Sequence, residues 1–527
     1  MSSELSSNSQ LYGNLLSPLL SPEAIPEKVT MDDMLEKYCG EFGLWQLRHL
    51  VLSSLAWLLQ GIHTSVMIFA DREPAWHCLM SHAGYTTPRC PTTAGSMCDL
   101  EPSSWEWSSG KGSSTMSEFG LICGDKFKVG LVQSIFFAGC MIGAGVFGHL
   151  SDSKLGRKGS LAMVCILNTI FGILTAFSSD YSTYVMFRFL TGLSAGGTGI
   201  IAFVIGTEPV GQSWRGVAGM SPFYFYSTGI AVVSAIGYFI QPWRSLYIAS
   251  SIPSVIFVIF LLPFLHESPR WYLVRGKVDE AMKIMQKIAV SNGKPNIPDG
   301  IVLALDSEVN EDVPNAQSDT KEAVKGTILD VLRSPITRIR FFLGVAVNFF
   351  SSAVYYGLSL NAVNLGTNLY LNVALNAVAE MPAYLLSAFV LDRLGRKPVA
   401  IGTMWFSGVF CLAGSLVKST NEAWKVVRMV CGLLGIFGIA GTFSILYVYL
   451  MELFPTVVRN AALGCATQAV QLGAISAPIV VVLGGGAPFA VFGACGIAGG
   501  FLVTYLPETL NKPLYDTMDG LQEAEAK

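Results

Sequence analysis

Gly148-His149-Leu150-Ser151-Asp152-Ser153-Lys154-Leu155-Gly156-Arg157-Lys158 interrupts a long apolar region of the chain. A related stretch, Leu391-Asp392-Arg393-Leu394-Gly395-Arg396-Lys397, occurs again 240 positions later, counted from Asp152 to Asp392. Each stretch is followed by an arginine, then by a glutamate and an arginine seven positions apart, then by another glutamate. These residues are Arg188, Glu208, Arg215 and Glu267 in the first half, and Arg428, Glu452, Arg459 and Glu508 in the second. The repetition predicts a chain built twice from one helical plan.

The composition indicates a membrane protein. Of the 527 residues, 51% are hydrophobic and only 13% are charged, about half the charged fraction of a soluble domain. The mean hydropathy is +0.49. The net charge of −3 gives no reason to expect nucleic-acid binding. Residues 1–44 are polar and acidic, without an apolar run long enough for a cleavable signal peptide.

Apolar runs long enough to cross a bilayer predict an all-α integral membrane protein with twelve transmembrane helices in two six-helix pseudo-repeats. The expected first-half helices are 46–70, 127–150, 159–178, 182–207, 215–240 and 245–265. The expected second-half helices are 339–362, 368–391, 398–417, 425–451, 460–483 and 487–506. The chain then divides into an N-terminal segment (1–45), a first bundle (46–265), a linker (266–338), a second bundle (339–506) and a tail (507–527).

The loops that contain the two charged stretches are rich in Lys and Arg, which places them in the cytoplasm together with the linker and both termini. The loop 72–126 is then non-cytoplasmic. It carries Cys78, Cys90, Cys98 and Cys123, which predict two disulfides with three pairings open. Four free thiols or a metal site are the alternatives.

Several motifs resemble a known family. Gly148 to Lys158 resembles the loop 2–3 motif of the major facilitator superfamily, and His266-Glu267-Ser268-Pro269-Arg270-Trp271 resembles its motif after helix 6. Tyr355-Tyr356-Gly357-Leu358-Ser359-Leu360-Asn361 and Glu452-Leu453-Phe454-Pro455-Thr456-Val457-Val458-Arg459-Asn460 are similar to segments of the organic cation/carnitine transporters. The chain has no Asn-x-Ser/Thr sequon, unlike the usual animal members, so it is closer to the plant branch.

The resemblance implies a gating role for the repeated charges. Asp152 is expected at the start of helix 11 near Arg459, and Asp392 at the start of helix 5 near Arg215, where helix dipoles favour the negative charges. Such contacts would latch the cytoplasmic side shut. The alternative is that the charges only set the topology. The expected gating set is Asp152, Arg157, Arg188, Glu208, Arg215, Glu267, Arg270, Asp392, Arg396, Arg428, Glu452 and Arg459.

Polar and aromatic side chains inside the predicted helices are the candidates for substrate binding. Glu380 is an acidic residue in mid-helix, where a charge is costly and usually functional, and it matches an acidic position of the family. Gln471 replaces the Asp of cation-transporting relatives and the Arg of anion or carnitine relatives, which leaves the substrate charge open. The other candidates are Tyr224, Tyr226, Tyr355, Tyr356, Tyr370, Gln133 and Gln468, because aromatic faces hold quaternary ammonium groups. Structural hydrogen bonding and packing are the alternatives.

These observations predict a transporter of small organic cations or zwitterions, such as carnitine, quaternary amines and polyamines, that works by alternating access. No enzymatic, nucleotide-binding or metal-binding motif is present, so neither a catalytic residue nor a cofactor is expected. Protons are a candidate coupling ion. A proton-coupled sugar transporter, an organic anion transporter and a non-transporting membrane sensor are the alternatives. Of the two membranes considered, the vacuolar membrane is favoured over the plasma membrane.

Overall fold

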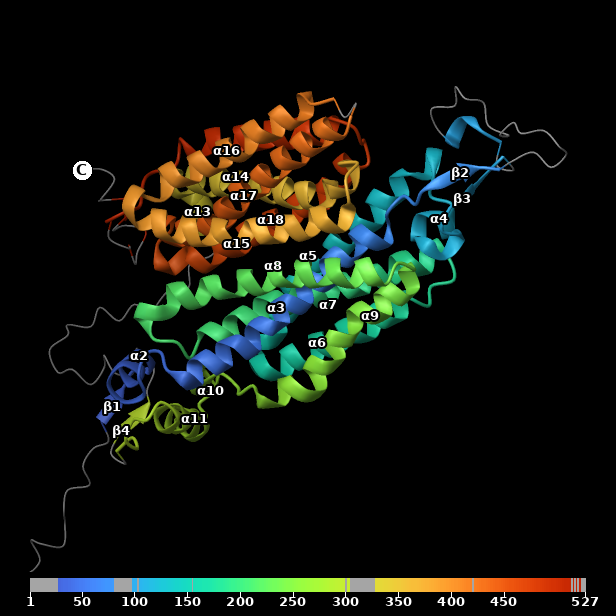
Figure 1. The fold of residues 1–527 in the computed structure, drawn as a ribbon. Helices are drawn as coiled ribbons and strands as arrows, with labels where there is room; N and C mark the ends of the chain where they lie inside the picture. The colour runs from blue at the N-terminus through green and yellow to red at the C-terminus, as the bar shows by residue number, and fades with distance from the viewer. Residues whose placement is uncertain are drawn as a thin grey trace, which may run out of the picture. The chain divides into compact units, whose positions relative to one another are not determined.

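A computed structural model describes residues 27–79, 97–101, 104–153, 155–298, 301–303, 328–418 and 421–512, with residues 515, 518, 521 and 522 (Figure 1). The chain divides into two compact units. The first comprises residues 1–49, 207–215 and 266–318, and the second comprises residues 50–206, 216–265 and 319–527, as far as each is described.

The second unit is built from long apolar helices. Those of the N-terminal half are α3 (Leu44–Ala70), α5 (Phe127–Asp152), α6 (Gly156–Thr175), α7 (Tyr181–Thr207), α8 (Arg215–Phe239) and α9 (Trp243–Ile256), which continues through η6 (Phe257–Leu261) and η7 (Leu262–Phe264). Those of the C-terminal half are α14 (Pro335–Leu360), α15 (Leu369–Leu394), α16 (Arg396–Leu416), α17 (Glu422–Leu453), α18 (Thr456–Val481) and α19 (Ala487–Val503).

These twelve helices coincide with the twelve predicted spans. Among the described residues, ten helices are long and apolar enough to cross a membrane. The other two are α8, which has 25 residues, and α19, a shorter apolar helix of 17 residues. The predicted all-α architecture is therefore confirmed. A short α13 (Ile328–Arg333) precedes the second set of helices.

Glycines let neighbouring helices of the first half approach closely. A Cβ atom on Gly143 of α5 would lie 1.8 Å from the carbonyl oxygen of Leu193 on α7. A Cβ atom on Gly192 of α7 would likewise lie 2.1 Å from the carbonyl oxygen of Phe136 on α5. Only a residue without a side chain fits at these crossings, as is common where membrane helices pack.

The helix ends form two sets. The motif end carries the charged stretches after α5 and α15, and the loop end carries the long connection between α3 and α5. At the loop end, β2 (Trp76–Cys78) pairs in antiparallel fashion with β3 (Trp105–Trp107), and α4 (Thr115–Phe119) follows.

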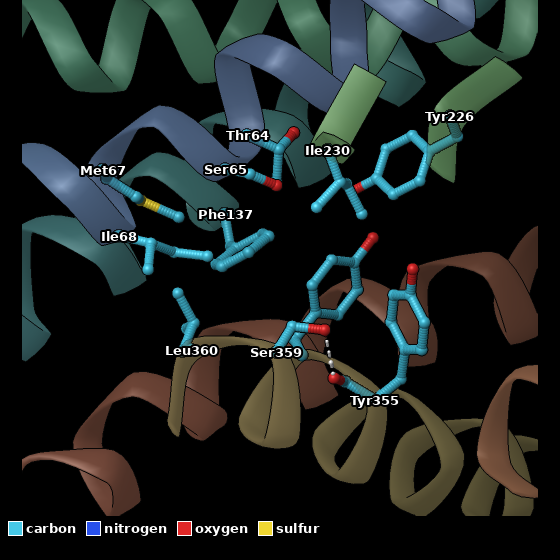
Figure 2. Close-up of a pocket in the computed structure, with 11 residues that line it drawn as sticks. Thr64, Ser65, Met67, Ile68, Phe137, Tyr226, Ile230, Tyr355, Ser359 and Leu360 are labelled. Carbon is cyan, nitrogen blue, oxygen red and sulfur yellow. Dashed lines mark hydrogen bonds between the residues drawn. The ribbon is translucent and has the colours of Figure 1, made fainter. Parts of the chain in front are cut away.

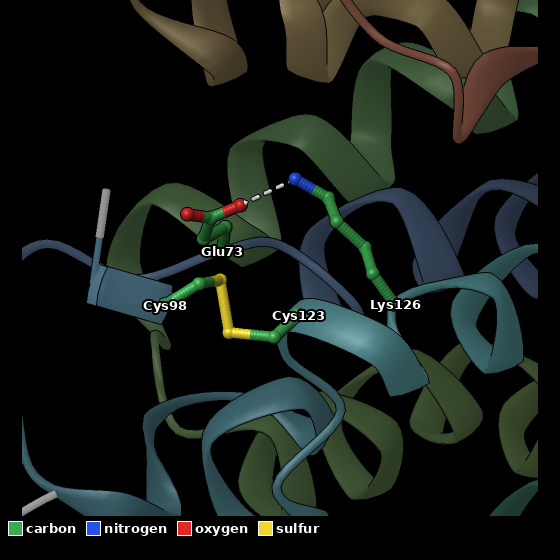
Figure 3. Close-up of a disulfide and its surroundings, with 4 residues drawn as sticks. All are labelled: Glu73, Cys98, Cys123 and Lys126. Atoms are coloured by element: carbon green, nitrogen blue, oxygen red, sulfur yellow. Dashed lines mark hydrogen bonds and ion pairs between the residues drawn. A yellow bond between two sulfur atoms is a disulfide. The ribbon is translucent and has the colours of Figure 1, made fainter. Parts of the chain in front are cut away.

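A disulfide joins Cys98 to Cys123 at the loop end, and Lys126 donates a 2.8 Å ion pair to Glu73 nearby (Figure 3). Cys78 is also disulfide-bonded, and Cys90 lies outside the described residues. One predicted disulfide is thereby confirmed with its pairing, and the three described cysteines of this loop are all disulfide-bonded.

The first unit joins the N-terminal segment to the start of the linker. Strand β1 (Glu27–Val29) pairs in parallel with β4 (Ile301–Leu303), and α2 (Met31–Met34) leads into η1 (Leu35–Cys39). The linker contributes α10 (Pro269–Val274) and the amphipathic α11 (Val278–Ser291). Its core consists mainly of apolar side chains from these elements, among them Met34, Leu35, Met285, Ile288 and Leu303. The described parts of residues 1–49 and 266–318 therefore lie in one compact unit, although the sequence predicts an N-terminal segment (1–45) and a separate linker (266–338).

Asn292, just after α11, ties the linker to the start of α3. Its Nδ2 donates to the carbonyl of Cys39 at 2.9 Å and to Oε1 of Gln46 at 2.8 Å. Its Oδ1 accepts from the backbone N–H of Trp45 at 3.2 Å. One amide side chain of the linker thus bonds three residues that lie about 250 positions earlier in the chain.

Candidate substrate-binding site

Glu380 lies in the middle of α15 and is fully buried. Tyr355 donates a 3.0 Å hydrogen bond to its Oε1 atom. Tyr384 donates to Oε2 at 3.3 Å, and the Ser227 hydroxyl donates to the same oxygen. A carboxylate buried in a membrane protein is costly unless hydrogen bonds compensate for its lost hydration. Three hydroxyl groups provide that compensation here.

The three hydroxyls come from three helices. Tyr384 is four residues after Glu380, so both side chains lie on one face of α15. Tyr355 reaches the carboxylate from α14, and Ser227 reaches it from α8 of the N-terminal half. The carboxylate is therefore bonded from both halves of the helical unit.

A small cavity lies next to this cluster (Figure 2). Both halves line it: α3, α5 and α8 from the first, and α14 from the second. The lining residues are Thr64, Ser65, Met67, Ile68, Phe137, Tyr226, Ile230, Tyr355, Tyr356, Ser359 and Leu360. Tyr355 connects the cavity to Glu380, because its side chain lines the cavity and its hydroxyl donates to the carboxylate.

More aromatic rings surround the carboxylate on the α8 side. The rings of Phe223 and Tyr224 lie 5.6 Å and 5.7 Å from the ring of Tyr384, measured between centroids. Tyr355 contacts the ring of Phe443 on α17 at 5.2 Å. Aromatic faces next to a carboxylate suit an organic cation, because the ring quadrupole and the negative charge both attract it.

The structure thus brings together five of the predicted substrate-binding residues. Glu380, Tyr224, Tyr226, Tyr355 and Tyr356 all lie at the carboxylate or the cavity. Ser227, Tyr384 and Phe137 belong to the same region and were not predicted. The i, i+4 relation of Tyr384 to Glu380 could have indicated it. Neither Ser227 nor Phe137 has a signal in the sequence that separates it from ordinary helix packing.

Tyr370 lies elsewhere, at the loop end of α15. Its ring stacks on Phe69 of α3 at 5.4 Å, and its hydroxyl accepts a 2.5 Å hydrogen bond from Arg72. Its backbone carbonyl accepts a 2.5 Å bond from Ser234 of α8. Tyr370 therefore joins α3 and α8 to α15 at the loop end, and it is not among the residues that line the cavity.

Gln133 takes part in a second buried polar cluster around Asp71. Its amide donates to Asp71 at 3.3 Å, and the hydroxyls of Thr115 and Tyr184 donate to the same carboxylate at 2.7 Å each. Asp71 was not predicted as a site residue, because it lies just after the predicted end of the first helix (46–70). The other two predicted glutamines, Gln468 and Gln471, lie half-buried on α18.

Three of the predicted gating residues of the C-terminal half, Asp392, Arg396 and Glu452, form a network at the motif end. Arg396 makes two 3.0 Å contacts with Glu452 and a 3.3 Å ion pair with Asp392. Glu508 accepts from the backbone N–H groups of Arg396 and Lys397, at the start of α16, and from Thr509 and Leu510. Partial burial opposes ionisation of Glu508, but these four donors outweigh it and hold the pKa of the carboxyl below its usual value.

Asp152 pairs with Arg157 in its own loop, as Asp392 does with Arg396. Arg459 donates from Nε to the carbonyl of Phe454 at 3.3 Å. Glu267 accepts from the backbone N–H of Ser268 at 2.9 Å. Glu208 falls in the first unit, on the segment 207–215. The predicted contacts of Asp152 with Arg459 and of Asp392 with Arg215 remain predictions.

Arg188 and Arg428 do not belong to the motif end. Both lie near the starts of their helices, α7 and α17, which are at the loop end. Arg188 is buried over the ring of Phe136 at 4.3 Å, and Arg428 donates to the carbonyl of Gly485. The gating role of these two arginines remains a prediction, and the length of α17 separates Arg428 from Glu452 of the motif-end network.

In the first unit, Asp32 forms ion pairs with both Arg215 and Arg270. One carboxylate of the N-terminal segment thus connects Arg215, at the start of α8, to Arg270 of the linker. Partial burial raises the pKa of Asp32, but the two guanidinium groups outweigh this and leave the pKa below its usual value of 3.8.

We expect Asp32→Asn to loosen the first unit and lower its unfolding midpoint, because both arginines lose their shared partner. Each pair is partly exposed, so the loss is modest, on the order of 1 kcal/mol. Since the folded pKa is depressed, the stabilisation is present above pH 3.8 and is lost as the pH falls through the folded pKa. Limited proteolysis of residues 27–43 would measure it. Asp33→Asn is the matched control, and equal cleavage of both variants would contradict the role of Asp32.

Comparison with known proteins now gives the family. The sequence profile named "Sugar (and other) transporter" matches residues 89–519. The chain is 62% identical to organic cation/carnitine transporter 4 of Arabidopsis thaliana over 95% of this chain and 93% of that protein. The chain belongs to the organic cation/carnitine transporter family. It is also 34% identical to organic cation/carnitine transporter 3 of the same plant, and 31% identical to the organic cation transporter protein of Drosophila melanogaster, over 96% and 93% of this chain respectively.

Solved structures show the same fold for this organic cation/carnitine transporter family member. The xylose transporter XylE of E. coli, in a partially occluded inward open conformation, superposes with a TM-score of 0.65 over 89% of this chain and all of that one. The sequence identity is 19%, so the likeness concerns the fold alone. Together with the family profile, it confirms the major facilitator fold, and the relatives agree with the plant branch.

Proposed function

We propose that this protein moves small organic cations or zwitterions across a membrane by alternating access. Carnitine, quaternary amines and polyamines are the expected substrates. The observation that carries the proposal is the buried carboxylate of Glu380, which lies next to an aromatic cavity lined by both halves. The names of the relatives point to the same substrate class.

Contacts between equivalent positions of the two halves support the rocking mechanism. Phe203 and Tyr447 each precede a motif glutamate by five positions (203 to 208, 447 to 452). Their rings meet at 5.5 Å. Equivalent residues of a repeat can touch only close to the pseudo-twofold axis that relates the halves. We therefore place this aromatic pair at the closure between the cavity and the motif end.

A gate at the motif end is the second part of this proposal. The charged networks of Asp152 with Arg157 and of Asp392 with Arg396 and Glu452 lie at the motif end. We assign this end to the cytoplasm, because short cytoplasmic loops carry the excess of Lys and Arg. The disulfide-bearing loop end then faces the opposite compartment, in keeping with its oxidised cysteines. The vacuolar membrane and proton coupling are the remaining proposals.

The cavity disfavours the organic anion alternative. No Arg or Lys occurs among its eleven described lining residues, whereas the carboxyl group of Glu380 accepts a hydrogen bond from one of them, Tyr355. A sugar is the second candidate, because the matching profile also covers sugar transporters. A sugar site requires many hydrogen-bonding groups, whereas this cavity is mostly aromatic and aliphatic.

Reconstitution into liposomes tests the proposed function. Labelled tetraethylammonium, carnitine and xylose are offered separately, with and without an inside-negative potential of 100 mV, worth about 2.3 kcal/mol per charge. Uptake of the first two, with tetraethylammonium driven by the potential, supports the proposal. Uptake of xylose alone would show that the protein transports sugars instead of organic cations. Substrate binding without flux would favour the membrane sensor.

Tyr356 gives a test of the aromatic contribution. Its half-buried ring lines the cavity and meets Phe137 at 4.7 Å. We expect Tyr356→Ala to raise the KM for tetraethylammonium by about 3- to 30-fold, since a desolvated cation–π contact contributes about 0.5–2 kcal/mol. Tyr356→Phe keeps the ring and should behave like the wild type. Equal KM values for the two variants would show that the ring does not contact the cation.

A further inference from the structure

Of the three hydroxyl groups that donate to Glu380, only that of Ser227 belongs to the opposite half of the protein. Tyr355 and Tyr384 belong to α14 and α15, which lie in the same half as Glu380. Ser227 belongs to α8 of the other half and donates to Oε2. Any motion that separates α8 from α15 therefore stretches the Ser227 bond while leaving the two tyrosine bonds intact.

A second serine on α8 makes a similar contact with a different kind of acceptor. Ser234 follows Ser227 by seven residues, two helical turns, so both serines lie on one face of the helix. Ser234 donates to the backbone carbonyl of Tyr370, and Ser227 to a carboxylate. Hydrogen bonds to an ionised acceptor are roughly twice as strong as those between neutral groups. Of the two bonds, only that of Ser227 is made to a carboxylate oxygen, which would also attract a cation.

Three hydroxyl groups enclose the carboxylate in this structure, and two of them donate to Oε2. Oε1 accepts from Tyr355, and Oε2 accepts from both Tyr384 and Ser227. Glu380 has no exposed surface. An arriving ammonium group must therefore take the place of a donor before it contacts the charge. The donor on the opposite half is the one that can leave without disturbing α14 or α15.

We propose that Ser227 is an affinity-determining residue that competes with the substrate cation for Glu380. With the site empty, its hydroxyl bonds the carboxylate and holds α8 against α15. When a cation binds, the hydroxyl gives up Oε2, which couples substrate binding to the contact between the halves. The inference rests on the proposed function and identifies what sets the apparent affinity of the same site.

The test compares three single variants in proteoliposomes with labelled tetraethylammonium. Ser227→Ala removes the competitor, so we expect the KM to fall by about tenfold or more, the size of one hydrogen bond to a charged group. Ser227→Thr keeps the hydroxyl and should restore the wild-type KM. Ser234→Ala removes a bond between the same two helices without touching Glu380, and its KM should stay unchanged. Ser227→Cys, a weaker donor, replaces the alanine variant if the latter does not fold.

A second measurement separates competition from loosened packing. The midpoint of thermal unfolding is recorded with and without saturating tetraethylammonium. Ser227→Ala should lower the midpoint of the empty protein but increase the upward shift caused by the cation, whereas a purely structural serine would lower both states equally. An unchanged or raised KM in Ser227→Ala, with wild-type flux and a defective Glu380→Gln, overturns this inference alone. Absence of cation flux in the wild type overturns the proposed function instead.

Discussion

Uptake of tetraethylammonium falls to background in Glu380→Gln, which is the largest effect that we expect from a single substitution. The amide removes the only acidic group in the described contacts of the cavity residues, and its NH2 group faces hydroxyls that donate to a carboxylate. Loss of one partner of a buried charge pair costs about 2–5 kcal/mol. The KM should therefore rise at least about 30-fold.

Two further variants make this result specific. Glu422→Gln removes an exposed carboxylate at the start of α17, where it pairs with Lys425, and should leave uptake unchanged. Glu380→Asp keeps the charge on a shorter side chain and should retain partial activity. Wild-type uptake in Glu380→Gln would make the carboxylate structural and would move substrate binding elsewhere in the helical unit.

Loss of the Cys98–Cys123 disulfide has the second-largest expected effect, on stability. The bond closes a 25-residue separation, and the chain-entropy relation gives about 3.5 kcal/mol for a loop of that length. The loop includes Thr115, which donates to Asp71, and Glu118, which bonds Trp243 and Arg244 at the start of α9. Cys123→Ser should therefore weaken the loop end as a whole.

Thermal unfolding of the purified protein measures this effect. The Cys123→Ser variant should unfold at a lower temperature than the wild type, and a membrane-impermeant reductant should lower the wild-type midpoint in the same way. Cys495→Ser on α19 is the control, because Cys495 is a free cysteine. If the reductant has no effect on a midpoint that Cys123→Ser lowers, the serine substitution itself, rather than the missing bond, is responsible.

The sequence by itself determined the helices and their repetition. Each predicted apolar run is long enough to span a membrane, so local hydrophobicity sufficed to locate α3, α5 to α9 and α14 to α19. The same reasoning identified Glu380, since an ionisable group inside such a run is costly and therefore stands out. It also identified the cysteine-bearing loop. The structure gives the pairing of one disulfide there, Cys98 with Cys123.

Only the tertiary structure decided which side chains meet. Ser227 and Glu380 are 153 residues apart, and nothing local in either segment indicates that they form a hydrogen bond. Tyr370 and Gln133 are polar residues in membrane helices like the others, but their depth along the helix places them with Arg72 and Asp71 rather than at the cavity. Asp32 lies in the N-terminal segment, and its two arginines belong to helices that are about 180 and 240 residues further along the chain. Hydrophobic patterns record the burial of a residue, whereas partner choice depends on helix packing, which the pattern of a single segment does not contain.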